Sequence, residues 1–421
     1  LLARMEEVVK EIYELAGGEF NISSPMQIGK MFTEMGVTSS LKTPKGKDSW
    51  NEAALVNINH RIAGLIRQHR TLEKLQSTYV DPYLETTVMH TSFCNWGTST
   101  GRLSSREPNL QNIPRNHFKL LEPQITDEDR AEIESRISAM VASKGVSFTA
   151  HLSNDVLKAW AFIGDESYDP SDTTQIAIRS FFIPRPNYSL ISFDYSQMEV
   201  RVFMSYFRNE TIDALLNTED ADFHGEAAKL AFGVEESSPQ FKFYRQMAKA
   251  VTFGTIYGIG NKKLSQQLGT SASEAGKYKQ QYFEGLEGSK DFFDKVVDTV
   301  LTRGWIRNRY GRRYRIAPEF AYKGVNYLVQ GTSADILSER MIAIDAFLHD
   351  KQSKLLLQVH DEVICEIHDS ELSTVPFEIK ALLEQNSLDI PLKVDMEICT
   401  PSWATKKTFT GTSFEDCIDW D

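Results

Sequence analysis

Apolar residues recur with the period of an amphipathic helix at the start of the chain. Residues 1–18 follow this pattern and stop at a pair of glycines, as helices commonly do. Ser23 or Ser24 can serve as an N-cap and Pro25 suits a first helical position, so a second helix is expected to begin there. The pattern then predicts one long helix from about 51 to 79.

Two apolar runs farther along predict buried strands, and both contain carboxylates. SLISFDYSQ contains Asp194, and KLLLQVHDEVICEI contains Asp361 and Glu362. An unpaired carboxylate is costly to bury, so either the second run turns at this point or a cation lies opposite. If the two strands lie side by side, the two aspartates meet and need a cation between them. Two Mg²⁺ ions held by these carboxylates and by substrate phosphates would suit an in-line displacement at phosphorus.

A helical block separates the two strands. Residues 222–298 have a mostly helical pattern, and a further helix is expected from about 324 to 347. Strands on either side of such a block predict a mixed α/β (α+β) fold with a helical insertion. A loop, 98–114, precedes the first strand; it is rich in turn formers and has almost no periodicity.

One stripe of side chains in the helical block suits a nucleotide. It consists of Arg245, Lys249, Phe253 and Tyr257, which recur every four residues. Cations neutralise a polyphosphate, and aromatic rings stack on a base and a sugar. The alternative is an ordinary amphipathic helix with a partly aromatic core face. Gly254 and Gly258 favour the nucleotide-binding interpretation. Glycine weakens a helix, so its presence indicates a requirement such as the close approach of a ligand.

Charge does not identify the partner by itself. The chain has 421 residues, 58 acids and 46 Lys and Arg, for a net charge of −12. This balance argues against polyanion binding by the whole surface but leaves room for a local basic groove. Six arginines between 303 and 315 lie among aromatic residues. They suit either a phosphate backbone or a solvated face.

Cysteine spacing and hydropathy bear on the compartment. Four scattered cysteines without a C-x-x-C pair favour reduced thiols over a disulfide framework or a zinc site. No run of 18 apolar residues is present, so no membrane span is expected. We expect a cytoplasmic protein, bacterial or in a host cytoplasm if viral, with an organelle as the alternative.

Five motifs together carry a family resemblance. The chain resembles the family A DNA polymerases, the polymerase portion of bacterial DNA polymerase I and its phage relatives. The motifs are TGRLSSREPNLQNIP, DYSQMEVR, RQMAKAVTFGTIYG, NYLVQGTSADI and QVHDE, in this order. The resemblance implies a right-hand polymerase with palm, fingers and thumb, an antiparallel palm sheet, and largely helical fingers and thumb. It implies a monomeric, template-directed DNA polymerase that uses dNTPs, primer-template DNA and two Mg²⁺ ions, with Mn²⁺ as a substitute, and that lacks an exonuclease domain in this chain.

The resemblance also assigns the chemistry. Asp194 and Asp361 match the two metal-binding carboxylates, with the Tyr195 backbone carbonyl as a further ligand. Glu362 matches a neighbouring acid that supports the site without being an essential ligand. Lys249 would hold phosphates and protonate the departing pyrophosphate.

Nucleotide contacts follow in the same way. Arg245 would bind the β- and γ-phosphates with Lys249, Phe253 would pack on the incoming sugar and base, and Tyr257 would close the pocket near the templating position. Glu199 matches the position that crowds a ribose 2′-OH, which favours deoxynucleotides. His224 and Gln197 complete the nucleotide-binding set.

The implied DNA contacts come from several segments. Arg102 matches a primer-template backbone contact, and Tyr322 stands where the family usually has an arginine. Polar side chains at the minor groove would test base-pair geometry rather than sequence. The minor-groove positions are Arg179, Asn326, Gln330 and His360, and Arg70 and Lys74 are further DNA-binding candidates.

The domain boundaries follow from the motif order. We expect thumb and start of palm at 1–115, palm at 179–207, fingers at 208–300, and palm with a C-terminal tail at 301–421. Residues 116–178 form an insertion atypical of the family. It is either a surface elaboration or a docking module for a replisome or processivity partner, or an extra clamp on DNA.

Three rival functions remain open at this point. A single-subunit RNA polymerase would share the fold, and reverse transcription is compatible with it. A noncatalytic DNA-binding protein is the alternative from another class, and it would not need Asp194 or Asp361.

Overall fold

A computed structural model divides the chain into two compact units. The first comprises Leu1–Met89 and Ile113–Phe181, and the second comprises His90–Asn112 and Phe182–Asp421. Most of the predicted insertion at 116–178 lies outside the described residues. No helix in the described part is long and apolar enough to cross a membrane. The structure describes residues 1–43, 45–84, 86–120, 134–135, 171–172, 175–218 and 221–409.

The first unit begins with the two helices that the pattern predicts. Helix α1, Leu2–Ala16, ends at Gly17, whose φ of 72° is left-handed and suits glycine. Helix α2, Pro25–Glu34, begins after Ser24, whose side chain accepts a hydrogen bond from the Gln27 backbone N–H.

The predicted helix from 51 to 79 is wrong as a single element. It is divided into α3 (Glu52–Val56) and α4 (Arg61–Leu75), followed by a π-helical turn, η1 (Gln76–Val80), and a short 3-10 turn, η2 (Asp81–Tyr83). The His60 ring nitrogen accepts the Ile62 N–H at 3.2 Å and so caps a new helix within the periodic run. Local capping therefore overrides the continuous apolar pattern.

A small core holds the first unit together. Phe32 and Trp50 stack with ring centroids 5.0 Å apart, and the apolar faces of α1 and α4 pack beside them. Strands β3 (Phe118–Lys119) and β4 (Gln175–Ile176) pair nearby, followed by η3 (Ile178–Phe181).

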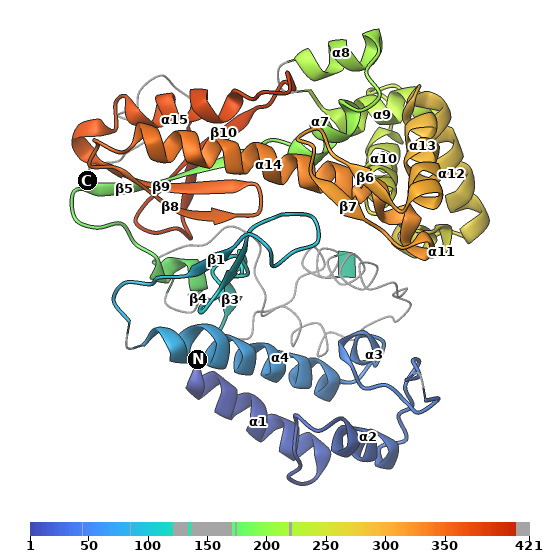
Figure 1. Cartoon of the computed structure of the whole chain (residues 1–421). Helices are drawn as coiled ribbons and strands as arrows, with labels where there is room; N and C mark the ends of the chain where they lie inside the picture. Colours follow the sequence, from blue (N-terminus) through green and yellow to red (C-terminus); the bar gives the residue numbers. More distant parts are fainter. Residues whose placement is uncertain are drawn as a thin grey trace. The chain divides into compact units, whose positions relative to one another are not determined.

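The second unit is built on a five-stranded antiparallel sheet (Figure 1). Alternation along β5 divides its side chains between two faces. Ile191 and Phe193 belong to the core, and the Tyr195 hydroxyl donates to the Leu383 carbonyl at 2.6 Å. Ser192 and Asp194 therefore lie on the opposite face. The strands are, in spatial order, β11 (Lys406–Thr408), β10 (Val394–Cys399), β5 (Tyr188–Tyr195), β9 (Glu362–His368) and β8 (Lys354–Val359).

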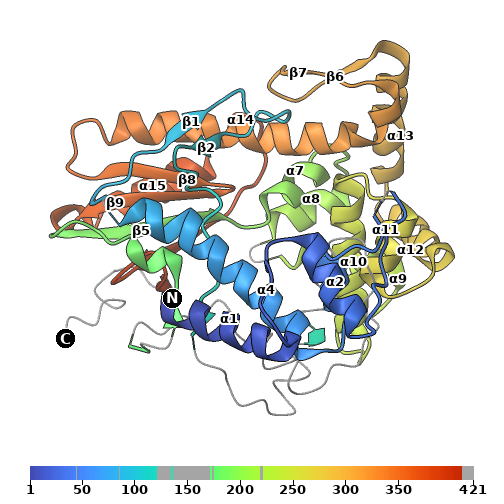
Figure 2. The ribbon, with the colours of Figure 1, turned by 90° about the horizontal axis from the view of Figure 1, so that it is seen from below.

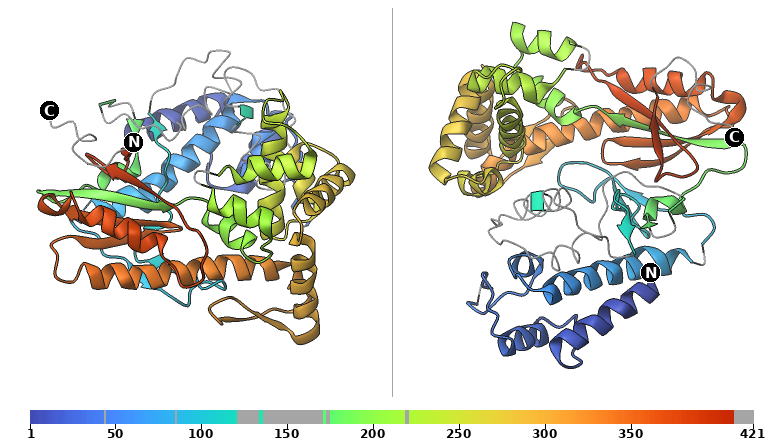
Figure 3. Two further views of the ribbon diagram at one scale, coloured as in Figure 1. Left: turned by 90° about the horizontal axis from the view of Figure 1, so that it is seen from above. Right: turned by 180° about the vertical axis from the view of Figure 1, so that it is seen from behind.

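Two helices cover the core face of this sheet. Helix α14, Gly324–Phe347, has the bounds that the pattern predicts, and α15 is Val375–Glu384. The two helices lie beside each other along the sheet, as Figures 1 and 3 show. The helical block predicted at 222–298 is confirmed. Its helices, with those just before it, are α7 (Met198–Met204), α8 (Glu210–Asn217), α9 (Phe223–Phe232), α10 (Phe241–Ile256), α11 (Asn261–Leu268), α12 (Ala272–Gly285) and α13 (Ser289–Arg303).

Two hairpins complete the second unit. Strands β1 (Ser92–Cys94) and β2 (Ser104–Arg106) flank the loop at 95–103, and β6 (Trp305–Arg307) pairs with β7 (Arg313–Arg315). Short turns follow β7 at η4 (Pro318–Lys323) and β9 at η5 (Asp369–Glu371). The mixed fold class with an antiparallel sheet is thus confirmed.

One close approach ties the β6–β7 hairpin to α14. The Tyr314 hydroxyl donates to the Thr100 carbonyl at 3.1 Å and accepts from the Asn308 side chain at 3.2 Å. A Cβ at Gly331 would meet this hydroxyl at 1.8 Å and the Thr100 carbonyl at 3.0 Å. Only glycine lets helix, hairpin and loop meet here.

We predict that Gly331→Ala destabilises the second unit. The added methyl group must displace the Tyr314 ring, an overpacking change that costs about 1–3 kcal/mol. The control is Gly260→Ala, because a Cβ at Gly260 meets nothing within 4 Å. Chemical denaturation of both variants checks the difference. Equal midpoints would show that the contact is relaxed without cost.

Candidate active site

A row of carboxylates crosses one face of the sheet. Asp194 stands directly opposite Glu362 on β9 and opposite Asp395 on β10. Residues directly opposite each other in an antiparallel pair share a face, and like charges there repel. The arrangement therefore needs positive charge nearby. Asp395 was not anticipated, because nothing in its own segment marks it.

Asp361 lies next to this row, at the turn between β8 and β9. His360 adopts a φ of 57°, which turns the chain, and it is exposed. The Tyr195 backbone N–H donates to the Asp361 carbonyl at 3.3 Å. The turn that is one of the two alternatives for this run is therefore present, and the structure brings Asp194 and Asp361 to one end of neighbouring strands. Both side chains are half-buried.

Arg102 supplies positive charge on one side of the site. Its guanidinium donates to Glu199 and reaches the Asp361 carboxylate at 3.4 Å. The Tyr257 hydroxyl donates to the other oxygen of Glu199 at 2.7 Å. Burial and the Glu199 charge raise the pKa of Tyr257, so it remains a proton donor. A continuous chain of contacts thus runs from the end of α10 to Asp361.

Lys406 supplies positive charge on the other side. Its ammonium group donates to Glu362 at 2.8 Å and to Glu397 at 2.7 Å. Burial opposes this charge, but the two carboxylates outweigh it and raise the pKa of Lys406. The same Glu362 oxygen accepts from the Ser192 hydroxyl at 2.6 Å and from the Trp403 indole at 3.4 Å.

These contacts define what Glu362 does in this structure. The side chain is buried, and one carboxylate oxygen is held by three donors from three segments. Such a network fixes its rotamer and neutralises it internally. Its predicted place at the margin of the metal site remains a prediction.

The stripe predicted on the helical block lies on α10. The Arg245 guanidinium donates to Asp222 at 2.6 Å, and this contact raises the pKa of Arg245. Lys249 is exposed one turn later. The Phe253 and Tyr257 rings are nearly parallel, with centroids 6.1 Å apart. Cationic and aromatic ends of the stripe are therefore arranged as expected, with Asp222 as an unanticipated partner.

His224 packs beside the aromatic end of the stripe. Its ring centroid is 5.6 Å from that of Phe253. Burial, reinforced by the Lys249 charge, lowers the pKa of His224 to about 4. The ring is therefore neutral at pH 7. Among the described residues, its buried Nδ1 has no hydrogen-bond partner, which suits a contact with a bound ligand.

The glycines near the stripe have a structural reason. Gly258 has a φ of 66°, and a Cβ there would meet the Tyr322 backbone carbonyl at 2.7 Å. A Cβ at Gly254 would make only ordinary contacts. The end of α10 and the approach of η4, rather than a ligand, account for Gly258.

The remaining nucleotide and DNA candidates are distributed over both units. Gln197 has a φ of 53° before α7, and its buried side-chain oxygen has no hydrogen-bond partner among the described residues. Asn326 and Gln330 lie one turn apart on α14, half-buried, and Gln330 hydrogen-bonds Tyr257. In the first unit, Arg179 is buried, Lys74 is exposed, and Arg70 donates to the Trp50 carbonyl at 3.3 Å.

Asp194 and Asp361 fit a hard divalent ion only if other groups complete its coordination. Within the described residues, no group of three or more His, Cys, Asp or Glu side chains is suited to holding a metal. Mg²⁺ commonly binds through one or two carboxylates together with substrate phosphates and water. The half-buried oxygens of Asp194 and Asp361 match that donor set.

Comparison with known proteins decides the family. The family described as DNA polymerase family A matches residues 1–161 and 169–405. The chain belongs to DNA polymerase family A. Bacillus subtilis DNA polymerase I is 33% identical over 427 residues, which cover 96% of this chain and 42% of that protein. The thermostable DNA polymerase I of Thermus filiformis is 30% identical over 415 residues, 94% of this chain and 43% of that protein.

A solved structure agrees with this family assignment. The POL domain of Pol1 from M. smegmatis, in complex with DNA primer-template and dNTP, has a TM-score of 0.71 and 27% identity. The match covers 96% of this chain and 65% of that one. The chain spans less than half the length of the curated family A relatives described above.

We predict that Lys406→Met strongly destabilises the second unit. The change leaves the buried Glu362 carboxylate without its cation, and breaking a buried ion pair in this way costs about 2–4 kcal/mol for a partly solvated lysine. Lys407→Met is the matched control, because Lys407 is exposed on the same strand. Denaturant unfolding measures both. Equal stability of the two variants would contradict the role of Lys406 as the cation that stabilises buried Glu362.

Proposed function

We propose that this family A chain is a template-directed DNA polymerase that adds deoxynucleotides to a primer 3′ end. The observation that carries the proposal is the meeting of Asp194 and Asp361 at one end of β5 and the β8–β9 hairpin. The cation-aromatic stripe of α10 supports it from the same unit. The complex of the M. smegmatis relative with DNA primer-template and dNTP supports the same substrates.

The two aspartates would hold the metal ions together with the Tyr195 carbonyl. Two bound Mg²⁺ ions would activate the primer hydroxyl and stabilise the charge that develops on the phosphates. The protein's own part is to hold the two carboxylates in register. The antiparallel pairing of β5 with β9 and the Tyr195 N–H contact to Asp361 do this. Such positioning and charge neutralisation supply most of the rate in phosphoryl transfer.

Arg245 and Lys249 would bind the triphosphate. The Asp222 contact holds the Arg245 guanidinium before a nucleotide arrives and leaves its remaining N–H groups for phosphate oxygens. Lys249 would donate a proton toward the departing pyrophosphate. Neutral His224 would add one N–H donor without adding charge. The Phe253 ring would pack on the incoming sugar and base.

Glu199 would exclude ribonucleotides. Its side chain is buried and held from both sides by Tyr257 and Arg102. A carboxylate fixed in this way cannot move aside for a 2′-OH, whereas a mobile one could. The Tyr257 ring would close the same pocket near the templating base.

The remaining predicted roles are part of the same proposal. Arg102 pairs with Glu199 and Asp361 here, so a contact with the primer-template backbone would require it to share or exchange these partners. Asn326, Gln330 and His360 would contact the minor groove. A replisome partner for residues 116–178 stays a prediction.

We expect Asp194→Asn to lower the rate of primer extension by about 10³-fold or more. Losing one metal-binding carboxylate removes several kcal/mol of charge stabilisation, and each 1.4 kcal/mol is about tenfold. Asp395→Asn is the matched control, because it removes the same charge directly opposite Asp194. Single-turnover extension with Mg²⁺ measures both. Wild-type activity of Asp194→Asn would favour a noncatalytic DNA-binding protein instead.

We expect Glu199→Ala to relax the choice of sugar. The variant should incorporate ribonucleotides at a rate closer to that of deoxynucleotides, and Glu199→Gln should retain more discrimination because it keeps the bulk. Extension assays with each nucleotide type, on DNA and on RNA templates, give the ratio. A wild-type preference for ribonucleotides or for an RNA template would replace the proposed substrate with that of an RNA polymerase or a reverse transcriptase.

A further inference from the structure

The β6–β7 hairpin presents three of its arginines on one face. The register pairs Trp305 with Arg315 and Arg307 with Arg313. Ile306 and Tyr314 alternate with these residues and are buried, so they define the inner face. All four paired residues therefore lie on the outer face, which we call the arginine face. In Figure 2 the hairpin projects beyond α14, beside the end of α13.

Two other arginines of this segment serve the hairpin itself. The Arg312 guanidinium pairs with Asp335 on α14, with its Nε at 3.0 Å. Arg309 donates to the Ser205 carbonyl at 3.1 Å and stacks over Tyr206. These contacts anchor the hairpin to its unit. The arginine face is thus not needed to hold it in place.

The arginine face breaks a rule of sheet stability. Arg307 and Arg313 stand directly opposite each other, where like charges repel. Among the described residues, no carboxylate forms an ion pair with Arg303, Arg307, Arg313 or Arg315. The chain has more acidic than basic residues, so arginines without a carboxylate partner are unexpected on this face. Like charges paired in this way without a compensating ion pair point to function.

Trp305 organises these cations. The guanidinium carbons of Arg303 and Arg313 lie 4.0 and 4.3 Å from its ring centroid, and that of Arg307 lies 5.7 Å away. Stacking on a ring fixes the plane of a guanidinium and leaves its N–H edge for an anion. Several fixed guanidinium edges along a ribbon match successive phosphates of a nucleic-acid backbone.

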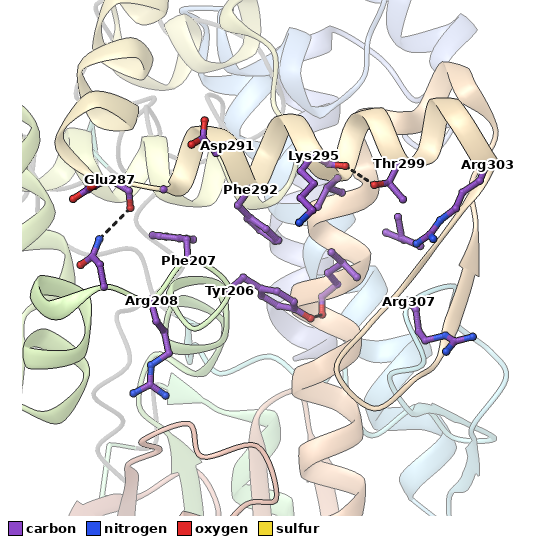
Figure 4. Close-up of a pocket in the computed structure, with 15 residues that line it drawn as sticks. Tyr206, Phe207, Arg208, Glu287, Asp291, Phe292, Lys295, Thr299, Arg303 and Arg307 are labelled. Carbon is purple, nitrogen blue, oxygen red and sulfur yellow. Dashed lines mark hydrogen bonds between the residues drawn. The ribbon is translucent and has the colours of Figure 1, made fainter.

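A cavity next to the hairpin suits unpaired bases. It has a volume of about 580 Å³ and is bordered by Arg303 and Arg307 (Figure 4). Tyr206 and Phe292 also line it and stack with centroids 4.9 Å apart. Aromatic platforms beside a cationic track are the pattern by which proteins bind single strands. Duplex DNA keeps its bases stacked inside and could not use such a cavity.

The hairpin connects directly with the proposed templating pocket. The chain leaves β7, enters η4 and brings Tyr322 against Gly258, the residue after Tyr257. Thr100, hydrogen-bonded by Tyr314, lies two residues from Arg102. The strand that emerges from this pocket ahead of synthesis is unpaired template.

We propose that the arginine face and the adjoining cavity bind the 5′ single-stranded overhang of the template. This inference rests on the proposed function for the location of the template, but binding of the overhang itself requires no catalysis. The phosphodiester backbone lies on the arginines, and an unpaired base enters the cavity. Recognition is independent of sequence.

The test is equilibrium binding by the whole chain of labelled primer-templates that carry either a blunt end or a long 5′ overhang. The wild type should bind the overhang substrate more tightly. Arg307→Ala/Arg313→Ala should remove about tenfold of that advantage and reduce the salt slope by about 1.4, at about 0.7 for each single-strand phosphate contact. Lys351→Ala/Lys354→Ala is the control, because it removes the same charge beyond the other end of α14.

Each outcome has a defined meaning. An equal loss on blunt and overhang substrates would overturn the proposal in favour of a duplex contact, and no loss would overturn it outright. An abasic overhang should bind more weakly than one with bases, and equal binding would overturn the role of the cavity. Asp194→Asn should leave the overhang advantage intact. Failure of the proposed catalytic role is therefore distinguishable from failure of this inference.

Discussion

The repulsion within one row of carboxylates is the constraint on which this molecule depends. Asp395, Asp194 and Glu362 stand side by side across three strands, with Asp361 at the adjacent turn. A sheet tolerates such a row only when cations lie on its margins. The second unit provides one from each side, Lys406 from its edge strand and Arg102 from the loop after β1.

The two cations at the margins differ in the groups that they contact. Lys406 is committed to Glu362 and Glu397, and with Ser192 and Trp403 it makes a closed network. Arg102 contacts Glu199 and Asp361, and Glu199 in turn contacts Tyr257 at the end of α10. One margin is therefore structural, whereas the other connects the carboxylates with the helix that carries the cation-aromatic stripe. A movement of α10 would therefore displace Asp361 through the contacts of Tyr257, Glu199 and Arg102.

Sequence reasoning found what local pattern can encode. Apolar runs located β5, β8 and β9, and four-residue spacing located the stripe of α10, because each signal lies within one element. Asp222, Asp395 and Lys406 were missed because their importance arises from pairing between segments far apart in the chain. The division of the predicted helix at 51–79 was missed for the opposite reason. His60 acts through a single local cap within an otherwise helical pattern.

The position of Lys406 in the chain order has a consequence for biosynthesis. A ribosome releases Asp194 and Glu362 long before it releases β11, and protein segments begin to fold as they emerge. Until Lys406 arrives, Glu362 and Glu397, on the two strands that flank β5, lack the cation that they share. This ion-pair network therefore completes the sheet only after nearly all of the described chain has been translated. The last described strand thus carries the charge that stabilises carboxylates synthesised before it.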